Sequence, residues 1–305
     1  MDWKHEISAA SKRIAGHAQV TPVMTSAGLR LGYPVELKLE HLQHTGSFKA
    51  RGAFNTLLST DVPAAGVVAA SGGNHGAAAA YAARALGHPA KIFVPEMAGP
   101  SKIALIERIG ADLSVVPGEY ANALTMARDH EARTGAMQIH AYDAPATVAG
   151  QGTCFAEWDS QGLQADTVLV AVGGGGLIAG ALAWFQGARK VVAVEPETSR
   201  ALNAALQAGA PVDVPVSGIA ANALGARRIG DICFGLAQGM TSVLVSDDAI
   251  AEAQQRLWQA HRILVEPAGA TALAALTSGV YTPEPGERVA VLVCGGNIAP
   301  DPLTA

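Results

Sequence analysis

The sequence "TVLVAVGGGGLIAGALAWFQGA", residues 167–188, decides the fold class of this chain. The stretch carries no charged residue and is long enough to suggest a membrane span. However, its first six residues form a run of strand length that is rich in β-branched side chains, and four consecutive glycines separate this run from a second apolar segment. The pattern therefore predicts a strand, a glycine turn and a buried helix rather than a membrane span.

The rest of the chain alternates in the same way. Short apolar runs predict further strands at 35–40, 66–71, 90–95, 112–116, 190–195, 241–246 and 288–294. The alanine-rich segments between them predict helices at 74–86, 101–109, 120–133 and 247–261. Strands with near-continuous apolar character that alternate with helices indicate parallel sheets covered on both faces. We find no repeat and no long linker, so we expect any second domain to form where the chain crosses between two lobes.

Composition excludes several classes of protein. Half of the 305 residues are hydrophobic and 15% are charged, which is unlike a disordered chain or a coiled coil. The net charge of −5 and the lack of a Lys/Arg cluster argue against binding to nucleic acid. The three cysteines, Cys154, Cys233 and Cys294, lie far apart, which fits a reducing compartment and neither a disulfide framework nor zinc-ligand spacing. Because the first residues are polar and unlike a signal peptide, we expect a cytoplasmic protein without membrane partners.

Three glycine-rich loops follow predicted strands: "ASGGNHGAA" at 70–78, "VGGGGLIAG" at 172–180 and "CGGN" at 294–297. In parallel sheets ligands bind at the carboxyl ends of the strands, and glycines leave backbone N–H groups free to bind an anion. The four glycines alone are a weak signal, since they lack the G-x-G-x-x-G spacing. "SGGNHG" is a stronger signal, because it places Ser71, Asn74 and His75 in one glycine-rich turn. Asn74 is equally expected as the N-cap of the next helix, and His75 as a packed or solvent-facing residue.

Lys49 lies in an unusual setting. It belongs to "HTGSFKARGA", residues 44–53, where a glycine-led turn precedes the start of a predicted helix. Its neighbours Phe48 and Ala50 are apolar, whereas a surface lysine normally lies on a polar helical face. From the residues alone, Lys49 is either a reactive amine or a solvated lysine at a helix start.

Four motifs in this order, "TGSFKARGA", "SGGNHG", "VGGGGL" and "CGGN", resemble the pyridoxal-phosphate enzymes of the tryptophan-synthase-β type, known as fold type II. The resemblance is greatest to the threonine/serine dehydratase and serine racemase branch. It extends over nearly the whole chain through "GHPAKIFVP", "AGQGT" and "VEPAGA". It implies a two-lobed α/β fold with parallel-rich twisted sheets covered by helices. Residues 1–60 and 144–305 would form the large cofactor-binding domain, and 61–143 the small domain with the "SGGNHG" loop.

The resemblance also implies the roles of site residues. Lys49 would hold pyridoxal 5′-phosphate as an imine and act as the catalytic base, because burial lowers the pKa of a lysine and leaves a nucleophilic amine. Phe48 would pack near the cofactor ring, Asn74 would bind its 3′-oxygen, and Cys294 would face the pyridine nitrogen. The phosphate would be bound by the backbone amides of Gly173, Gly174, Gly175, Gly176 and Leu177. The substrate carboxylate would be bound by Ser71, Gly72, Gly73, Asn74 and His75.

Cys294 favours one reaction type. A neutral thiol does not stabilise a pyridinium as a carboxylate would, so the ring is a weaker electron sink and elimination of a β-hydroxyl is favoured. Lys49 would take the α-proton, and the product would hydrolyse to a 2-oxo acid and ammonia. We therefore expect a homodimeric pyridoxal-phosphate ammonia-lyase acting on threonine, serine, 3-hydroxyaspartate or an aryl-serine. Taken alone, Cys294 is better interpreted as a buried structural cysteine.

Three alternatives stay open. A serine racemase would need a second acid or base, which the related racemases carry as a serine where this chain has Gly72. We therefore expect little D-product, and more racemisation in Gly72→Ser if the turn tolerates a side chain. A β-replacement enzyme of the cysteine synthase type would carry "TSGNTG" in place of "ASGGNHG". A non-enzymatic nucleotide-binding module would use the four glycines without cofactor chemistry.

The sequence departs from the racemase-like pattern in two places. Glu195 matches a glutamate that holds a divalent cation in those proteins, but Ala201 occupies the position of its aspartate partner, so we expect no metal site. "AAN" replaces the acidic "ADG" in the segment 217–230, where Arg227 and Arg228 either meet an acidic substrate or form surface ion pairs. Because the chain ends soon after "CGGN", we also expect no regulatory module.

Overall fold

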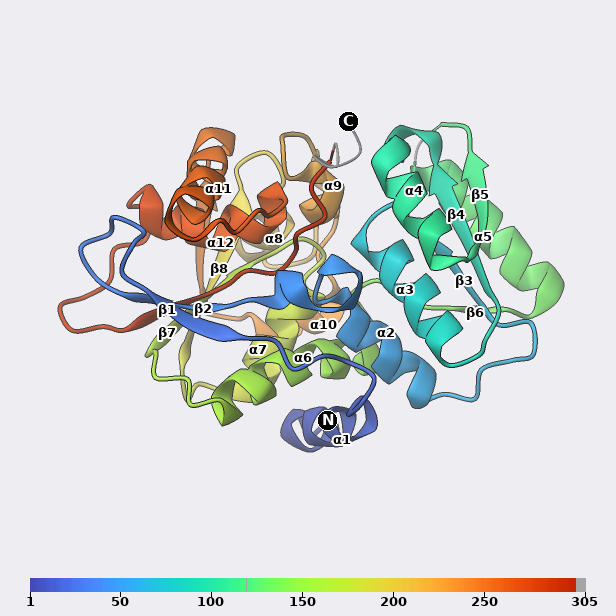
Figure 1. Cartoon of the computed structure of the whole chain (residues 1–305), viewed down its shortest axis with the longest axis horizontal. Helices are drawn as coiled ribbons and strands as arrows, with labels where there is room; N and C mark the ends of the chain where they lie inside the picture. Colours follow the sequence, from blue (N-terminus) through green and yellow to red (C-terminus); the bar gives the residue numbers. More distant parts are fainter. Residues whose placement is uncertain (119, 300–305) are drawn as a thin grey trace.

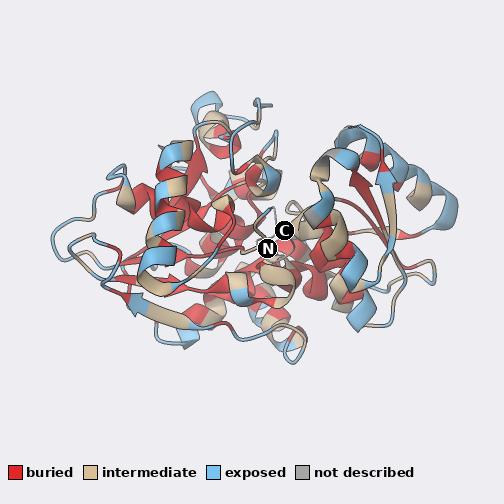
Figure 2. Ribbon diagram, turned by 45° about the horizontal axis from the view of Figure 1, so that its top comes forward, coloured by how far each residue is buried: buried red, intermediate tan, exposed pale blue. Residues whose placement is uncertain are grey.

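The computed structural model describes residues 1–118 and 120–299, which form two β-sheets in two lobes (Figure 1). The larger sheet has six strands in the order β1-β2-β10-β7-β8-β9, and the smaller has four in the order β5-β4-β3-β6. Helices cover both sheets, and Figure 2 shows that buried residues concentrate along the strands. The predicted fold class, a two-lobed α/β architecture with parallel-rich sheets, is confirmed.

The larger sheet is parallel except for one strand pair. Its strands are β1 (Val23–Ser26), β2 (Val35–Lys38), β7 (Thr167–Ala171), β8 (Lys190–Pro196), β9 (Thr241–Val245) and β10 (Val289–Leu292). Among the strand pairs that the structure describes in this sheet, only β1 and β2 pair antiparallel. Every residue of β7 and β10 is buried, as the continuous apolar runs predict for central strands. The short strand β1 was not predicted, because its mixed burial produces no apolar run.

Helices lie on both faces of this sheet (Figure 1). One face is covered by α12 (Pro267–Thr277), against which α11 (Asp247–His261) packs. The other face is covered by α7 (Gly176–Phe185). Helix α6 (Pro145–Ser160) packs against α7, and α1 (Trp3–Arg13) packs against α6. The connection between β8 and β9 contains α8 (Ala201–Ala208), α9 (Ala221–Leu224) and α10 (Asp231–Leu236). Residues 167–188 thus form a strand, a glycine loop and a buried helix, as predicted. No helix in the described part of the chain has the length and apolar character that crossing a membrane requires.

The smaller sheet is entirely parallel. It contains β3 (Val67–Ala70), β4 (Ala90–Pro95), β5 (Asp112–Val116) and the unpredicted two-residue β6 (Met137–Gln138). It packs against α3 (Asn74–Ala85), α4 (Pro100–Ile109) and α5 (Tyr120–Thr134). Helix α2 (Lys49–Leu58) contacts both α3 and α6 and so connects the lobes. We propose that the domain boundaries are those predicted from the sequence, with 61–143 as the small domain.

A buried ion network holds the start of α2 in place. The Arg51 guanidinium donates two hydrogen bonds to the Glu40 carboxylate, at 2.9 and 2.7 Å, and both side chains are almost fully buried. Burial alone would raise the pKa of Glu40, but the charge and hydrogen bonds of Arg51, with Thr21 and Lys38, lower it below its ordinary value of 4.5. Arg51 also pairs with Glu157 at 3.0 Å. Removing one partner would therefore leave an uncompensated charge in the interior.

We predict that Arg51→Met lowers the free energy of unfolding by about 3–5 kcal/mol, because Glu40 stays buried without its partner. The double change Arg51→Met, Glu40→Met should cost less than the single change. Because the folded pKa of Glu40 is lowered, the contribution of the pair is present above the unfolded pKa and is lost as the pH falls below it. Urea unfolding across pH measures both effects. Arg228→Met, which removes an exposed pair with Asp213, is the control and should lower the free energy of unfolding by less than about 1 kcal/mol. An equal loss of unfolding free energy in Arg51→Met and Arg228→Met would contradict the prediction.

Candidate active site

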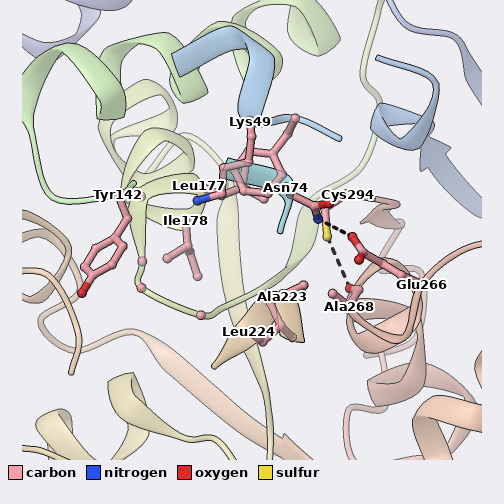
Figure 3. A pocket seen from close by; sticks show the side chains of 16 residues that line it. Lys49, Asn74, Tyr142, Leu177, Ile178, Ala223, Leu224, Glu266, Ala268 and Cys294 are labelled. Atoms are coloured by element: carbon pink, nitrogen blue, oxygen red, sulfur yellow. Dashed lines mark hydrogen bonds between the residues drawn. The ribbon is translucent and has the colours of Figure 1, made fainter. Parts of the chain in front are cut away.

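A pocket lies at the carboxyl ends of β7 and β10, where the first residues of α2 and α3 meet the larger sheet (Figure 3). It encloses about 460 Å³, including the part open to solvent, which is within the range of small-molecule sites. All nine residues predicted to bind a cofactor line it: Phe48, Lys49, Asn74, Gly173, Gly174, Gly175, Gly176, Leu177 and Cys294. Residues from four separate segments of the chain are therefore brought together.

Lys49 is the first residue of α2, and its amine is held inside the pocket. Its Nζ donates a hydrogen bond to the Ala141 carbonyl at 2.7 Å and lies 5.1 Å from the centroid of the Phe48 ring. Burial lowers the pKa of Lys49 from 10.5 to about 8, against a small opposing effect of Cys294. A substantial fraction of the amine is therefore neutral near physiological pH, which suits a nucleophile and a base. The interpretation of Lys49 as a solvated lysine is wrong.

The glycine loop between β7 and α7 approaches its surroundings so closely that only backbone fits. A Cβ on Gly174 would overlap the ring of Tyr142, and a Cβ on Gly173 would lie 2.9 Å from the Cα of Leu224. Gly175, with φ of +94°, precedes the first residue of α7. The first N–H groups of α7 have no acceptor within the helix, so the loop and the positive end of the helix dipole form a site suited to phosphate.

Asn74 connects the small lobe to the large lobe through its side-chain amide. Its Nδ2 donates to Glu266 Oε1 at 2.5 Å, drawn as a dashed line in Figure 3, and its Oδ1 accepts from Asn297 Nδ2 at 2.8 Å. The N-cap of α3 is Gly73, so the interpretation of Asn74 as the cap is wrong. An amide nitrogen carries two N–H groups, and the second is available to a ligand. Burial raises the pKa of Glu266 to about 7, which its hydrogen bond from Asn74 and the charge of Lys102 oppose.

Cys294 follows β10 and presents a neutral thiol. Its Sγ donates to the Ala268 carbonyl at 3.3 Å (Figure 3). Burial, reinforced by the nearby Glu266, raises the pKa of this thiol well above its ordinary value. The pocket therefore contains a partly neutral amine and a neutral thiol, and a ligand nitrogen beside Cys294 would meet no negative charge from this side chain.

The predicted substrate loop lies next to the pocket, but of its residues only Asn74 lines it. Ser71 Oγ accepts a hydrogen bond from Gly73 N at 3.2 Å, which shapes the turn. His75 Nε2 lies 2.9 Å from the Ile139 carbonyl oxygen. Burial, helped by the charge of Lys49, lowers the pKa of His75 to about 3, so the ring is neutral and packed.

Gly72 has no room for a side chain. A Cβ at this position would overlap the Cβ of Ala98 and lie 2.8 Å from Val94 Cγ1. These neighbours belong to the interior of the small lobe, not to the pocket. The condition attached to Gly72→Ser, that the turn tolerates a side chain, is therefore not met, and we no longer expect this variant to gain racemisation.

Glu195 is used by the fold. Its two carboxylate oxygens accept hydrogen bonds from the backbone N–H groups of Leu202 and Asn203, each at 2.8 Å, at the start of α8. Burial raises its pKa to about 7 despite these bonds. Within 1–118 and 120–299, no three His, Cys, Asp or Glu side chains are grouped so that they could hold a metal ion.

Arg228 forms an exposed ion pair with Asp213 at 3.3 Å, as one of the two sequence interpretations expected.

Sequence reasoning missed part of the pocket wall. Besides the predicted residues, the pocket is lined by Tyr142, Ala171, Ile178, Ala223, Leu224, Glu266 and Ala268. Glu266 lies in the motif "VEPAGA", whose acidic residue beside a proline was a usable signal. Tyr142 and Leu224 have no local signal, because they reach the glycine loop only through the packing of distant segments.

Known proteins match this chain over most of its length. The family described as "Pyridoxal-phosphate dependent enzyme" matches residues 14–295. Phenylserine dehydratase from Ralstonia pickettii is 36% identical over 300 residues, covering 95% of this chain and 92% of that protein. The structure of maize serine racemase superposes with a TM-score of 0.92 at 30% identity, covering 97% and 93% of the two chains. The crystal structure of a T.th. threonine deaminase superposes with a TM-score of 0.88 at 35% identity, covering 96% and 98%.

These matches agree with the amine of Lys49, the phosphate-suited glycine loop and the two-lobed fold. The chain belongs to the family of pyridoxal-phosphate dependent enzymes.

Proposed function

We propose that this protein is a lyase that removes water and ammonia from a 3-hydroxy amino acid, such as L-threonine or L-serine, and leaves a 2-oxo acid. The observation that carries the proposal is the neutral thiol of Cys294 in the same pocket as the amine of Lys49. A neutral thiol does not stabilise a protonated pyridine ring, so a long-lived carbanion at the α-carbon is disfavoured and elimination of the β-hydroxyl is favoured. The amine of Lys49 supplies the base. The names of the relatives, a phenylserine dehydratase and a threonine deaminase, support it.

The residues of the pocket fit pyridoxal phosphate. The glycine loop, in which a side chain would collide with Tyr142, would admit a phosphate to the backbone amides of Gly173 to Leu177. The second N–H of Asn74 is available for the 3′-oxygen, and Phe48 and Cys294 flank the space for the ring. When bound, this cofactor supplies an electron sink that acidifies the α-C–H bond of an amino acid.

Lys49 would hold the cofactor through its amine, and in its neutral form that amine would be the base that takes the α-proton. The β-hydroxyl leaves with one proton as water, and this proton is balanced by the α-proton that Lys49 takes. Addition of water to the released enamine then yields the 2-oxo acid and ammonia. The 71–75 turn binds the α-carboxylate and so orients the α-C–H bond toward Lys49. His75, neutral and bonded to Ile139, supports this turn rather than moving a proton.

Serine racemase is the alternative, favoured by the superposition with the maize enzyme. Racemisation needs a second proton donor on the face opposite Lys49. A serine at position 72 would supply it only if its side chain pointed into the pocket, and a Cβ at Gly72 points toward Ala98 and Val94. This direction argues for elimination.

Two finer points stay predictions. A homodimer is expected from the resemblance. Cytoplasmic location is expected because Cys154, Cys233 and Cys294 are all buried and unpaired, as in proteins of reducing compartments.

We predict that the purified protein is yellow and that borohydride links the cofactor irreversibly to Lys49, since its lowered pKa favours a covalent link to an aldehyde. Peptide mass spectrometry locates the label. Lys49→Ala should lose the label and the 2-oxo acid product, whereas Lys190→Ala, which changes a lysine at the edge of β8, should keep both. A label on any other lysine would contradict the role of Lys49.

We predict that chelators change the rate by less than about twofold, because both oxygens of Glu195 are used by α8 and one carboxylate rarely holds a hard cation alone. The rate of 2-oxo acid formation is measured after dialysis against EDTA, with and without added magnesium. Complete loss of activity that magnesium restores would mean that other residues form a cation site.

We predict that L-serine gives pyruvate with D-serine below about one hundredth of the product, since one base without a partner on the opposite face gives little racemisation. Chiral chromatography of a timed reaction measures both products. D-serine forming as fast as pyruvate would show that the racemase alternative is correct.

A further inference from the structure

A second chamber adjoins the pocket. The two cavities share Ala223, Glu266 and Ala268 in their walls. The rest of its lining comes from Lys102 of α4 and from six residues of other segments: Ile219, Ala220, Asn222, Pro267, Asn297 and Ala299. Lys102 comes from the small lobe, whereas the other lining residues belong to the large lobe. A substrate bound beside the cofactor pocket would therefore lie between the two lobes.

Lys102 carries an amino group without a hydrogen-bond partner among the described residues. The residue is only 8% exposed, although it lies at the first turn of a helix. Its Nζ makes no hydrogen bond and no ion pair within 4.0 Å with any residue in 1–118 or 120–299. Buried ammonium groups are costly without a partner, and this one has three N–H donors to offer. The side chain is thus poised to bind an anion from outside the protein.

The substrate turn lies next to this ammonium. A Cβ on Gly73 would be 4.0 Å from Lys102 Nζ and 3.4 Å from the Asn222 carbonyl oxygen. Gly73 caps α3, whose first N–H groups have no acceptor within the helix. The turn therefore lies between the positive end of a helix dipole and the amino group of Lys102, and both would attract the same anion. Burial lowers the pKa of Lys102, and the charge of Glu266 opposes this shift, as a bound carboxylate would.

Glu266 bears on which substrate carboxylate would bind beside Lys102. Its carboxyl group lines both cavities and attracts Lys102 from across the chamber. A second substrate carboxylate placed deeper in the chamber would face Glu266, whereas one held at the turn meets the helix end and the ammonium together. The geometry thus favours binding of the substrate's α-carboxylate over binding of an acidic substrate side chain.

We infer that Lys102 binds the α-carboxylate of the substrate, together with the 71–75 turn, and so joins a residue of α4 to the substrate site. The inference rests on the proposed function, because it assigns the partner of the substrate's carboxylate.

The test uses the cofactor-loaded enzyme and glycine, which has an α-carboxylate but no β-hydroxyl to lose. The cofactor's visible absorbance reports binding, so no turnover is needed. We expect Lys102→Met to raise the Kd of glycine by about 10- to 100-fold, the effect of losing a charged hydrogen bond, and Lys102→Arg to restore part of the affinity. Glycinamide, which lacks the carboxylate, should change by less than about threefold. In turnover, KM for L-serine and for L-threonine should rise alike, with kcat within a few-fold.

Lys91→Met is the matched control, since it removes a lysine of the same lobe that pairs with Asp112 at 2.7 Å and lies outside both cavities; its Kd for glycine should stay unchanged. Far-UV circular dichroism and cofactor content check folding, with Lys102→Gln as the second variant if Lys102→Met does not fold. An unchanged Kd for glycine, an equal loss for glycinamide, or a loss confined to 3-hydroxyaspartate would each overturn the inference. Wild-type enzyme that binds glycine but forms no 2-oxo acid would refute the proposed function and leave the assignment of Lys102 testable.

Discussion

The amide of Asn74 is the contact on which the site depends. Both of its ends are bonded to the large lobe, one to Glu266 and the other to Asn297, although Asn74 itself begins a helix of the small lobe. Asn297 also donates to the carbonyl of Thr45, four residues before Lys49. The same few hydrogen bonds therefore set the distance between the amine, the glycine-rich turn and the loop after β10. A change in how the lobes lie would move all three at once.

Close backbone approach is the second constraint. The loop after β7 packs against Tyr142 and Leu224 with no space for side chains, and that is also what leaves its amides free for a phosphate. Gly72 shows the same constraint in the small lobe, where the space for a Cβ is taken by Ala98 and Val94. The glycine at position 72, where the related racemases carry a serine, therefore depends on the packing of Ala98 and Val94 around it.

Charge in the pocket follows from burial more than from ion pairing. Burial lowers the pKa of Lys49 and raises those of Glu266 and Cys294, so groups that are charged or reactive in water tend toward their neutral forms here. A neutral amine and a neutral thiol suit proton removal followed by rapid expulsion of a leaving group. Lys102 lines the adjoining chamber and lies beside the 71–75 turn; burial lowers its pKa as well, and the charge of Glu266 opposes this shift.

The sequence by itself determined the fold class and the strand–glycine–helix unit at 167–188, because apolar periodicity and glycine runs are local signals that the chain carries in order. The nine residues that the family resemblance assigns to the cofactor were named from motifs in the sequence, and the structure brings them into one pocket. Tertiary structure alone decided which way a side chain at position 72 would point, that Glu195 caps α8, and that Tyr142, Glu266 and Lys102 surround the site. These features depend on contacts between segments far apart in the chain, such as Asn74 with Glu266. No local pattern records such contacts, since burial and distance exist only once the lobes have packed.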